Sequence, residues 1–246
     1  MSAQSDDRLH AVMLIWHGVA GGTEADYLNW HTSEHMTERL DLPGFIRGRR
    51  AHSPECVEQP YISIYEADEA DTFGSQTYRD RVNSPTPWSR RLHPKIINVI
   101  RGVFDMLAVR GAGVARSTLT IRMGASSVSP AQLAATAAEL CESVSKLSGV
   151  TSVRFGLAHR DATTSTTATD RGPDAADRVN AVLLVDSYDS ALLRAQCSHI
   201  VGLAQASGLT IQPESYAVYD VAYVLNSREP RGVSMISREP APDDTI

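Results

Sequence analysis

The residue types that could do chemistry are concentrated in one short segment, Tyr27–Leu40. It carries two histidines, His31 and His35, together with Glu34 and Arg39. A spacing of four residues places both imidazole rings on one side of a helix, with the arginine one turn further on. Acid-base chemistry or ligand binding is therefore predicted for this segment.

A helix over residues 23–41 would turn these side chains toward the protein interior. At 3.6 residues per turn, an apolar stripe runs along it, and His31, His35 and Arg39 fall on or beside the edge of that stripe. The stripe consists of Ala25, Leu28, Thr32, Met36 and Leu40. Glu34 lies further round, where it can orient an imidazole or meet water.

Three interpretations of the two histidines stay open. In the first, both rings satisfy polar groups at the edge of a packed helix. In the second, His31 or His35 titrates near neutral pH and moves a proton on a substrate, while Arg39 or Arg49 meets an anionic oxygen. In the third, the rings bind a metal, as the H-x-x-E-H spelling of residues 31–35 would allow, but no third ligand is identifiable and no metal site is predicted.

Residues outside the segment complete the predicted site. The expected substrate-binding side chains are His17, at the end of a strand, four aromatic residues and one arginine, namely Tyr27, Trp30, Tyr65, Trp88 and Arg49. Arg47 and Arg49 alternate onto one face of their strand, so inward-facing charges there would need an anionic ligand or an acidic partner. His199, on a later helix, is a candidate heme ligand without a supporting motif.

Hydrophobic periodicity predicts the same order of elements twice, β-α-β-β-α-β. The first half has strands at His10–His17, Phe45–Ser53, Tyr61–Glu66 and Ile96–Val109, and helices at Thr23–Asp41 and Asp68–Arg81. The second has strands at Ser117–Arg122, Val150–Ala158, Val179–Asp186 and Ser215–Leu225, and helices at Pro130–Lys146 and Ser190–Ser207. The final strands of the two halves are similar in sequence, which supports a repeat.

This order predicts an α+β fold of two tandem ferredoxin-like units, residues 1–112 and 113–226, packed sheet to sheet as a pseudo-dimeric α/β barrel within one chain. Only the first unit carries the histidine-rich helix. Residues 160–178 are predicted to be an insertion, and residues 227–246 a loosely held tail.

Composition restricts the class of protein. The 246 residues carry a net charge of −6, which gives no support to nucleic-acid binding, and no apolar run reaches the roughly 18 residues of a membrane span. The three widely spaced cysteines suggest neither a disulfide framework nor a metal site. The polar, acidic start has no secretion signal, so a cytoplasmic location is expected.

The chain also resembles a known superfamily. The pattern Trp30-His31-x-x-Glu34-His35, followed by Leu42-Pro43-Gly44-Phe45 and later by Pro85-Thr86-Pro87-Trp88, is similar to that of the dimeric α/β-barrel superfamily, in particular its EthD-like and tandem branches. The resemblance covers about the first 110 residues. It implies ferredoxin-like units that pair through their sheets, with Trp30, His31, Glu34 and His35 as the characteristic motif and Arg39 and Arg49 nearby. Members include monooxygenases, isomerases, cyclases and heme enzymes.

The functional prediction is a small-molecule enzyme that uses no cofactor and performs acid-base chemistry of the isomerase, cyclase, dehydratase or lyase type. Its substrate would be hydrophobic, oxygenated and anionic, and His31, His35, Glu34 and Arg39 would be catalytic. One alternative is a non-catalytic protein that binds a hydrophobic ligand or supports an assembly. Another is a heme- or metal-dependent oxidative enzyme. The protein is expected to be a monomer with internal pseudo-symmetry or a homodimer.

Overall fold

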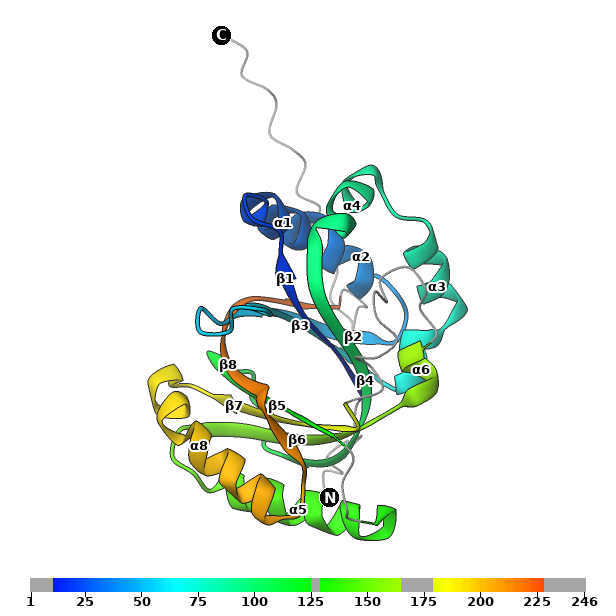
Figure 1. The fold of residues 1–246 in the computed structure, drawn as a ribbon. Coiled ribbons are helices and arrows are strands. Elements are labelled where there is room, and N and C mark those ends of the chain that lie inside the picture. The colour runs from blue at the N-terminus through cyan, green and yellow to red at the C-terminus, as the bar shows by residue number, and fades with distance from the viewer. Residues whose placement is uncertain (1–10, 125–128, 165–178, 228–246) are drawn as a thin grey trace, which may run out of the picture.

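The computed structural model describes residues 11–124, 129–164 and 179–227, and its centre is a closed barrel of eight antiparallel strands (Figure 1). The strands are β1 Ala11–Val19, β2 Phe45–His52, β3 Tyr61–Ala67, β4 Ile96–Arg110, β5 Ser117–Met123, β6 Val150–Ala158, β7 Ala181–Ser187 and β8 Ile211–Asn226. Their order around the barrel is β1-β3-β2-β8-β5-β7-β6-β4.

Helices cover the outside of this barrel (Figure 1). In the first half they are α1 Glu24–Trp30, a π-helical turn His31–His35, α2 Met36–Leu40, a 3₁₀ turn Ala70–Gly74, α3 Gln76–Asn83, α4 Pro87–Leu92 and a second 3₁₀ turn His93–Lys95. In the second half they are α5 Pro130–Ser145, α6 Arg160–Thr164 and α8 Ser190–Ala206. Within the described ranges, no helix is long and apolar enough to cross a membrane.

The barrel consists of two four-stranded sheets joined at their edges. Strands β1–β4 are ordered β4-β1-β3-β2, and strands β5–β8 are ordered β8-β5-β7-β6. Hydrogen-bonded ladders between β2 and β8, and between β4 and β6, close the two seams. The sequence predicted sheets packed face to face, whereas the backbone joins them edge to edge, which leaves no open strand edge on either sheet.

Strand alternation divides the core into an inner and an outer layer. In β1, Val12, Leu14 and Trp16 belong to the cluster that fills the barrel. The alternate residues face the helices, so Met13 packs in the outer cluster and His17 lies against α1. Both faces of the strands are thus covered, and every residue of β3 and β7 is buried.

The local structure departs from the sequence expectation in four places. The helix predicted over residues 23–41 is interrupted by the π turn. The segment 68–81 is a 3₁₀ turn followed by α3, and the proline-containing segment 84–88 contains the start of α4, which was not predicted. Within the predicted insertion 160–178, residues 160–164 form α6 and residues 165–178 lie outside the described part, as does the predicted tail beyond Ser227.

Candidate functional site

A narrow cavity of about 70 Å³ lies between the outer face of the first sheet and the helices of the first half. Seven of the ten predicted site residues line it: His17, Tyr27, Trp30, His31, His35, Arg39 and Tyr65. Side chains from β1, β3, β4 and α3 complete the wall. The histidine-bearing segment therefore borders a hollow.

The π turn sets which residues of the helical segment face this cavity. Tyr27, His31, Met36 and Leu40 are all buried, and their spacing is four, five and four residues. The interval of five is the π turn His31–His35, which inserts one residue and shifts the phase of the helix. The predicted apolar stripe is therefore wrong at its start, because Ala25 is exposed and the aromatic and imidazole side chains occupy the buried face instead.

Hydrogen bonds assign the tautomer of His17. Its Nδ1 lies 3.2 Å from the carbonyl oxygen of Gly18, which can only accept, so Nδ1 carries the proton. The Nε2 atom is then the acceptor for the hydroxyl of Tyr27, 3.1 Å away. This bond connects the end of β1 to α1 and fixes the edge of the cavity.

His31 and His35 each keep one ring nitrogen without a protein partner. His31 Nε2 lies 3.0 Å from the hydroxyl oxygen of Ser63 on β3. The Nδ1 atoms of both His31 and His35 are buried and have no hydrogen-bond partner among the described residues. The His35 ring also packs on Trp30, with centroids 4.3 Å apart. Buried polar atoms in proteins are normally bonded, so two free ring nitrogens at one cavity point to a ligand.

Burial keeps these imidazoles neutral at physiological pH. Desolvation lowers the pKa of His17 to about 4, with a smaller effect from the Arg50 cation. Desolvation, followed by nearby cations, also lowers the pKa of His31 and of His35 well below the ordinary value. These lowered pKa values disfavour titration of either ring near neutral pH, which was the second interpretation of the two histidines.

Arg39 brings a cation into this environment without a matching carboxylate. Its side chain is buried, its guanidinium lies 5.7 Å from the centre of the Tyr78 ring, and its Nη1 has no partner in the part of the chain that the structure describes. No acidic side chain among those residues forms an ion pair with it. The hydroxyl of Tyr65, in the same cavity, is likewise buried and unbonded. A buried cation of this kind calls for an anionic ligand.

Two of the predicted site residues lie behind the cavity wall. The Glu34 carboxylate accepts hydrogen bonds from Trp30 Nε1 at 3.1 Å and from the Thr86 hydroxyl at 2.6 Å, instead of orienting an imidazole. Trp88 donates its Nε1–H to Asp26 at 2.9 Å and does not line the cavity. Glu34 therefore ties the π turn to the start of α4.

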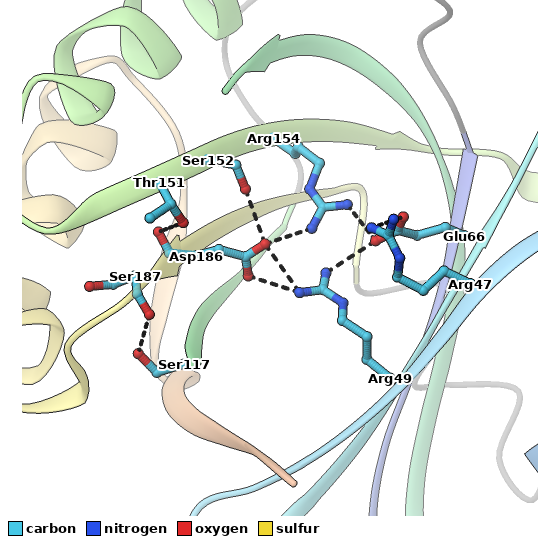
Figure 2. Close-up of polar contacts among 9 residues, drawn as sticks. All are labelled: Arg47, Arg49, Glu66, Ser117, Thr151, Ser152, Arg154, Asp186 and Ser187. Carbon is cyan, nitrogen blue, oxygen red and sulfur yellow. Dashed lines mark hydrogen bonds and ion pairs between the residues drawn. The ribbon is translucent and has the colours of Figure 1, made fainter. Parts of the chain in front are cut away.

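The third predicted residue outside the cavity, Arg49, points into the barrel (Figure 2). It lies 3.0 Å from Asp186 on β7 and 3.4 Å from Glu66 on β3. Arg154 on β6 bonds the same two carboxylates at 2.9 and 2.8 Å. The acidic partners that inward-facing charges require are thus provided by the protein, and Arg49 is not in reach of a ligand in the cavity.

Several cavity residues were not identified from the sequence, notably Ser63, Tyr78, His93 and Arg101. Alternation along β3 places Ser63 on the same face as Tyr65, so this residue could have been found. His93 follows α4, an element that was not predicted, and Tyr78 depends on how α3 folds back over the sheet. No local signal in the sequence identifies Tyr78 or His93 as a cavity residue.

The cavity beside Arg39 does not fit a heme or a bound metal. Cofactor-sized ligands need pockets of roughly 300–1,000 Å³, whereas this cavity has about 70 Å³. His199 lies on the exposed side of α8, and the buried face of that helix packs in the apolar core of the second half. In the described ranges, no group of three or more histidine, cysteine or acidic side chains could hold a metal ion.

Comparisons with known proteins identify the fold. No family model and no curated protein matches the sequence. Among solved structures, an anthrone oxidase-like protein aligns with a TM-score of 0.59 and 8% identity over 91% of this chain and 95% of that one. A variant of chlorite dismutase from Candidatus Nitrospira defluvii, in complex with cyanide, aligns with a TM-score of 0.55 and 8% identity over 88% and 92%. A protein named as a candidate monooxygenase from Fusobacterium nucleatum aligns with a TM-score of 0.52 and 11% identity over 89% and 95%.

These similarities establish an α+β, ferredoxin-like architecture with an eight-stranded antiparallel barrel. The similar structures carry names of oxidative proteins. None of these structures is named as an isomerase, cyclase, dehydratase or lyase, and this finding corrects the prediction of a cofactor-free acid-base enzyme of that type.

Proposed function

We propose that this protein is an oxidative enzyme that binds a small oxygenated molecule as its anion in the cavity beside Arg39. The observation that carries the proposal is the set of buried, unbonded polar atoms on the cavity wall: Nη1 of Arg39, Nδ1 of His31 and His35, and the hydroxyl of Tyr65. Such atoms are costly to bury unless a ligand satisfies them. The oxidative class is supported by the names of the similar structures.

The polar atoms suit a phenolate or enolate. Arg39 and the Tyr65 hydroxyl donate to the anionic oxygen, and a neutral imidazole of His31 or His35 accepts the proton that the substrate loses. Dioxygen is the proposed oxidant. The carbon conjugated to the bound oxygen forms a C–O bond with O2, the resulting peroxide anion takes a proton, and loss of water leaves a carbonyl group. One oxygen atom thus enters the substrate and the other leaves as water.

Because heme does not fit this cavity, no step of the proposed reaction uses it. The lowered pKa of His31 and His35 makes both rings weak bases, so the proton transfer in this scheme depends on the Arg39 cation, which lowers the pKa of the bound phenol or enol and stabilises the product anion.

The proposal is tested by measuring oxygen uptake with a panel of phenols and enolisable ketones of one to three rings. The wild type should consume O2 with at least one of them, and Arg39→Gln should lower kcat/KM by a factor of about 100 or more, the usual effect of losing a donor to an oxyanion. Arg81→Gln is the matched control, because Arg81 is an exposed arginine that pairs with Glu38 outside the cavity. Binding of these compounds without oxygen uptake would support the non-catalytic alternative instead.

We further propose the finer organisation suggested by the sequence: tandem ferredoxin-like units at residues 1–112 and 113–226, an EthD-like affiliation, a tail at residues 227–246, and a cytoplasmic monomer or homodimer. The strand orders β4-β1-β3-β2 and β8-β5-β7-β6 support the tandem arrangement, because both halves use the same order.

A further inference from the structure

A second hollow lies at one mouth of the barrel, outside the site described above. This groove has a volume of about 950 Å³ and lies among the loop after β2, the start of β4, β8 and helix α8. The volume falls in the range that small-molecule ligands use, and barrel mouths are common places for such ligands. The cavity beside Arg39 is too small to hold a substrate of several rings, which raises the question of where the rest of a larger substrate would lie.

The groove and the cavity share a wall. Ile96 and Val99, at the start of β4, line both hollows. Both side chains are half-buried, so each faces open space. The two hollows are therefore neighbours, separated by these aliphatic side chains.

This wall is an irregular part of the sheet. Asn98 has a φ of 53°, and the pairing of β1 with β4 shifts register between Trp16 and Gly18. A Cβ atom at Gly18 would lie 3.0 Å from the carbonyl oxygen of Glu58 and 3.2 Å from Cγ1 of Ile97, so a side chain there would require these neighbours to shift by a few tenths of an ångström. Bulges of this kind redirect side chains and occur next to binding sites.

The groove has the chemistry of a site for an apolar molecule with polar substituents. Val57 and Ile97 line it and are 86% and 41% exposed, respectively. Arg122, also in its lining, stacks on Trp16 with 5.2 Å to the ring centre and donates to Gln59 Oε1 at 2.6 Å. Apolar walls with a few oriented polar groups are typical of ligand sites.

We propose that the cavity and the groove are two sections of one binding site for an elongated, mostly apolar molecule with an anionic or enolisable end. The oxygen-bearing end lies beside Arg39, and the apolar body passes Ile96 and Val99 into the groove. This inference rests on the proposed function and specifies its substrate class.

The first test is a fluorescence titration with anthracene-2-carboxylate, a flat apolar probe with one anionic end that is longer than the cavity. The wild type should bind it. Arg39→Gln should weaken binding at least tenfold, and Val99→Trp, which obstructs the shared wall, should do the same. Val99→Ala should bind at least as tightly as the wild type. Arg81→Gln and Val114→Trp, at exposed positions away from both hollows, should change the affinity less than twofold.

The second test locates the probe through the cysteines. Cys56 and Cys197 line the groove, whereas Cys141 is fully buried in the second half. The bound probe should slow alkylation of Cys56 and Cys197 by N-ethylmaleimide at least fivefold in the wild type and not in Arg39→Gln at the same probe concentration. Cys141 is the internal reference: because it is buried, its alkylation would report unfolding of the protein.

Three outcomes would overturn the two-section site. Arg39-dependent binding without cysteine protection would place the probe in the cavity alone, and protection that persists in Arg39→Gln would make the groove a separate site. Absence of binding would exclude this substrate class. If both tests succeed but no compound supports oxygen uptake, the two-section site stands and the oxidative function fails.

Discussion

At the scale of single residues, Arg39 and Arg49 are both buried but differ in what surrounds their charge. Arg49 is in contact with Asp186 and Glu66, whereas Arg39 faces the cavity and has no acidic partner among the described residues. The free-energy cost of removing the Arg49 charge from water is offset by its two carboxylate partners. The same cost at Arg39 is not offset by an anion. The two side chains should therefore respond oppositely to removal of the charge.

We predict that Arg39→Met raises the free energy of unfolding of the ligand-free protein by about 1–2 kcal/mol, because it removes an unmatched buried cation. Arg49→Met should lower it by about 3 kcal/mol, because Asp186 and Glu66 lose a partner inside the barrel. Urea denaturation of both variants is the measurement. Equal destabilisation by the two substitutions would show that Arg39 serves packing and not a ligand.

The buried histidines predict a pH dependence of stability. Unfolding restores an ordinary pKa to His17, His31 and His35, so the unfolded state binds more protons below about pH 6.5, and stability must fall as the pH decreases. For His17 alone, a pKa of about 4 in place of 6.5 corresponds to roughly 3 kcal/mol that is lost between those pH values. Urea midpoints measured from pH 7 to pH 4.5 should decline steeply, and His17→Gln should make the decline shallower. A flat profile would mean that water reaches these rings.

At the scale of elements, the π turn is the main difference between the predicted helix and the observed one. The sequence between Trp30 and Met36 contains no glycine or proline, and nothing local indicates an inserted residue. The turn exists because tertiary packing buries Tyr27 before it, His31 at its first position, and Met36 and Leu40 after it. Periodicity could predict the helix and its bounds, but it could not predict the phase shift that decides which side chains meet the cavity.

Deleting Ser33 should convert this turn to an α-helix. Ser33 is exposed, and its hydroxyl bonds only to Asn29 in the described structure, so little packing is lost. Removing the inserted residue changes the spacing of Tyr27, His31, Met36 and Leu40 from four, five and four to four, four and four, so these side chains stay on the buried face and His31 and Arg39 stay on one side of the helix. We expect unchanged helical circular dichroism and an anthracene-2-carboxylate affinity within about twofold of the wild type. Ser33→Ala is the control for loss of the hydroxyl, and a tenfold loss of affinity in the deletion variant alone would show that the five-residue turn itself shapes the site.

Helix α4 illustrates a signal that was present but misinterpreted. Thr86 caps this helix by accepting the backbone N–H of Ser89 at 3.0 Å, and Pro87 occupies the first helical position. A threonine followed by proline is typical of a helix start, whereas two prolines close together, Pro85 and Pro87, are also typical of a segment without regular structure. Because α4 was missed, the location of His93 beside the cavity could not be predicted either.

At the scale of the whole molecule, one buried ion network links the two sheets. Arg49 and Glu66 come from the first half and Arg154 and Asp186 from the second, and all four meet inside the barrel (Figure 2). Burial raises the pKa of Asp186, but Arg49 and Arg154 outweigh it and hold the pKa below its ordinary value. The sequence could predict that Arg49 needed a partner, but not which acidic residue from 137 positions away would supply it.

We predict that Asp186→Asn lowers the free energy of unfolding by about 3–5 kcal/mol, because it leaves buried guanidinium groups without their anion. Both halves share this network and both seams of the barrel, so the loss should appear in a single unfolding transition. The measurement is urea denaturation followed by tryptophan fluorescence, which reports the first half, and by far-ultraviolet circular dichroism, which reports both. Two separate transitions in the wild type would show that the halves unfold independently.

The closed order of the strands has a consequence for how this protein meets other chains. Each of the eight described strands already has two hydrogen-bonded neighbours, so the native barrel offers no row of vacant amide and carbonyl groups that an incoming peptide could extend. Strand addition and fibril templating would first require a seam to separate. Association through the described barrel must consequently depend on side chains at its surface, where single substitutions can strengthen or abolish it without disturbing the strands.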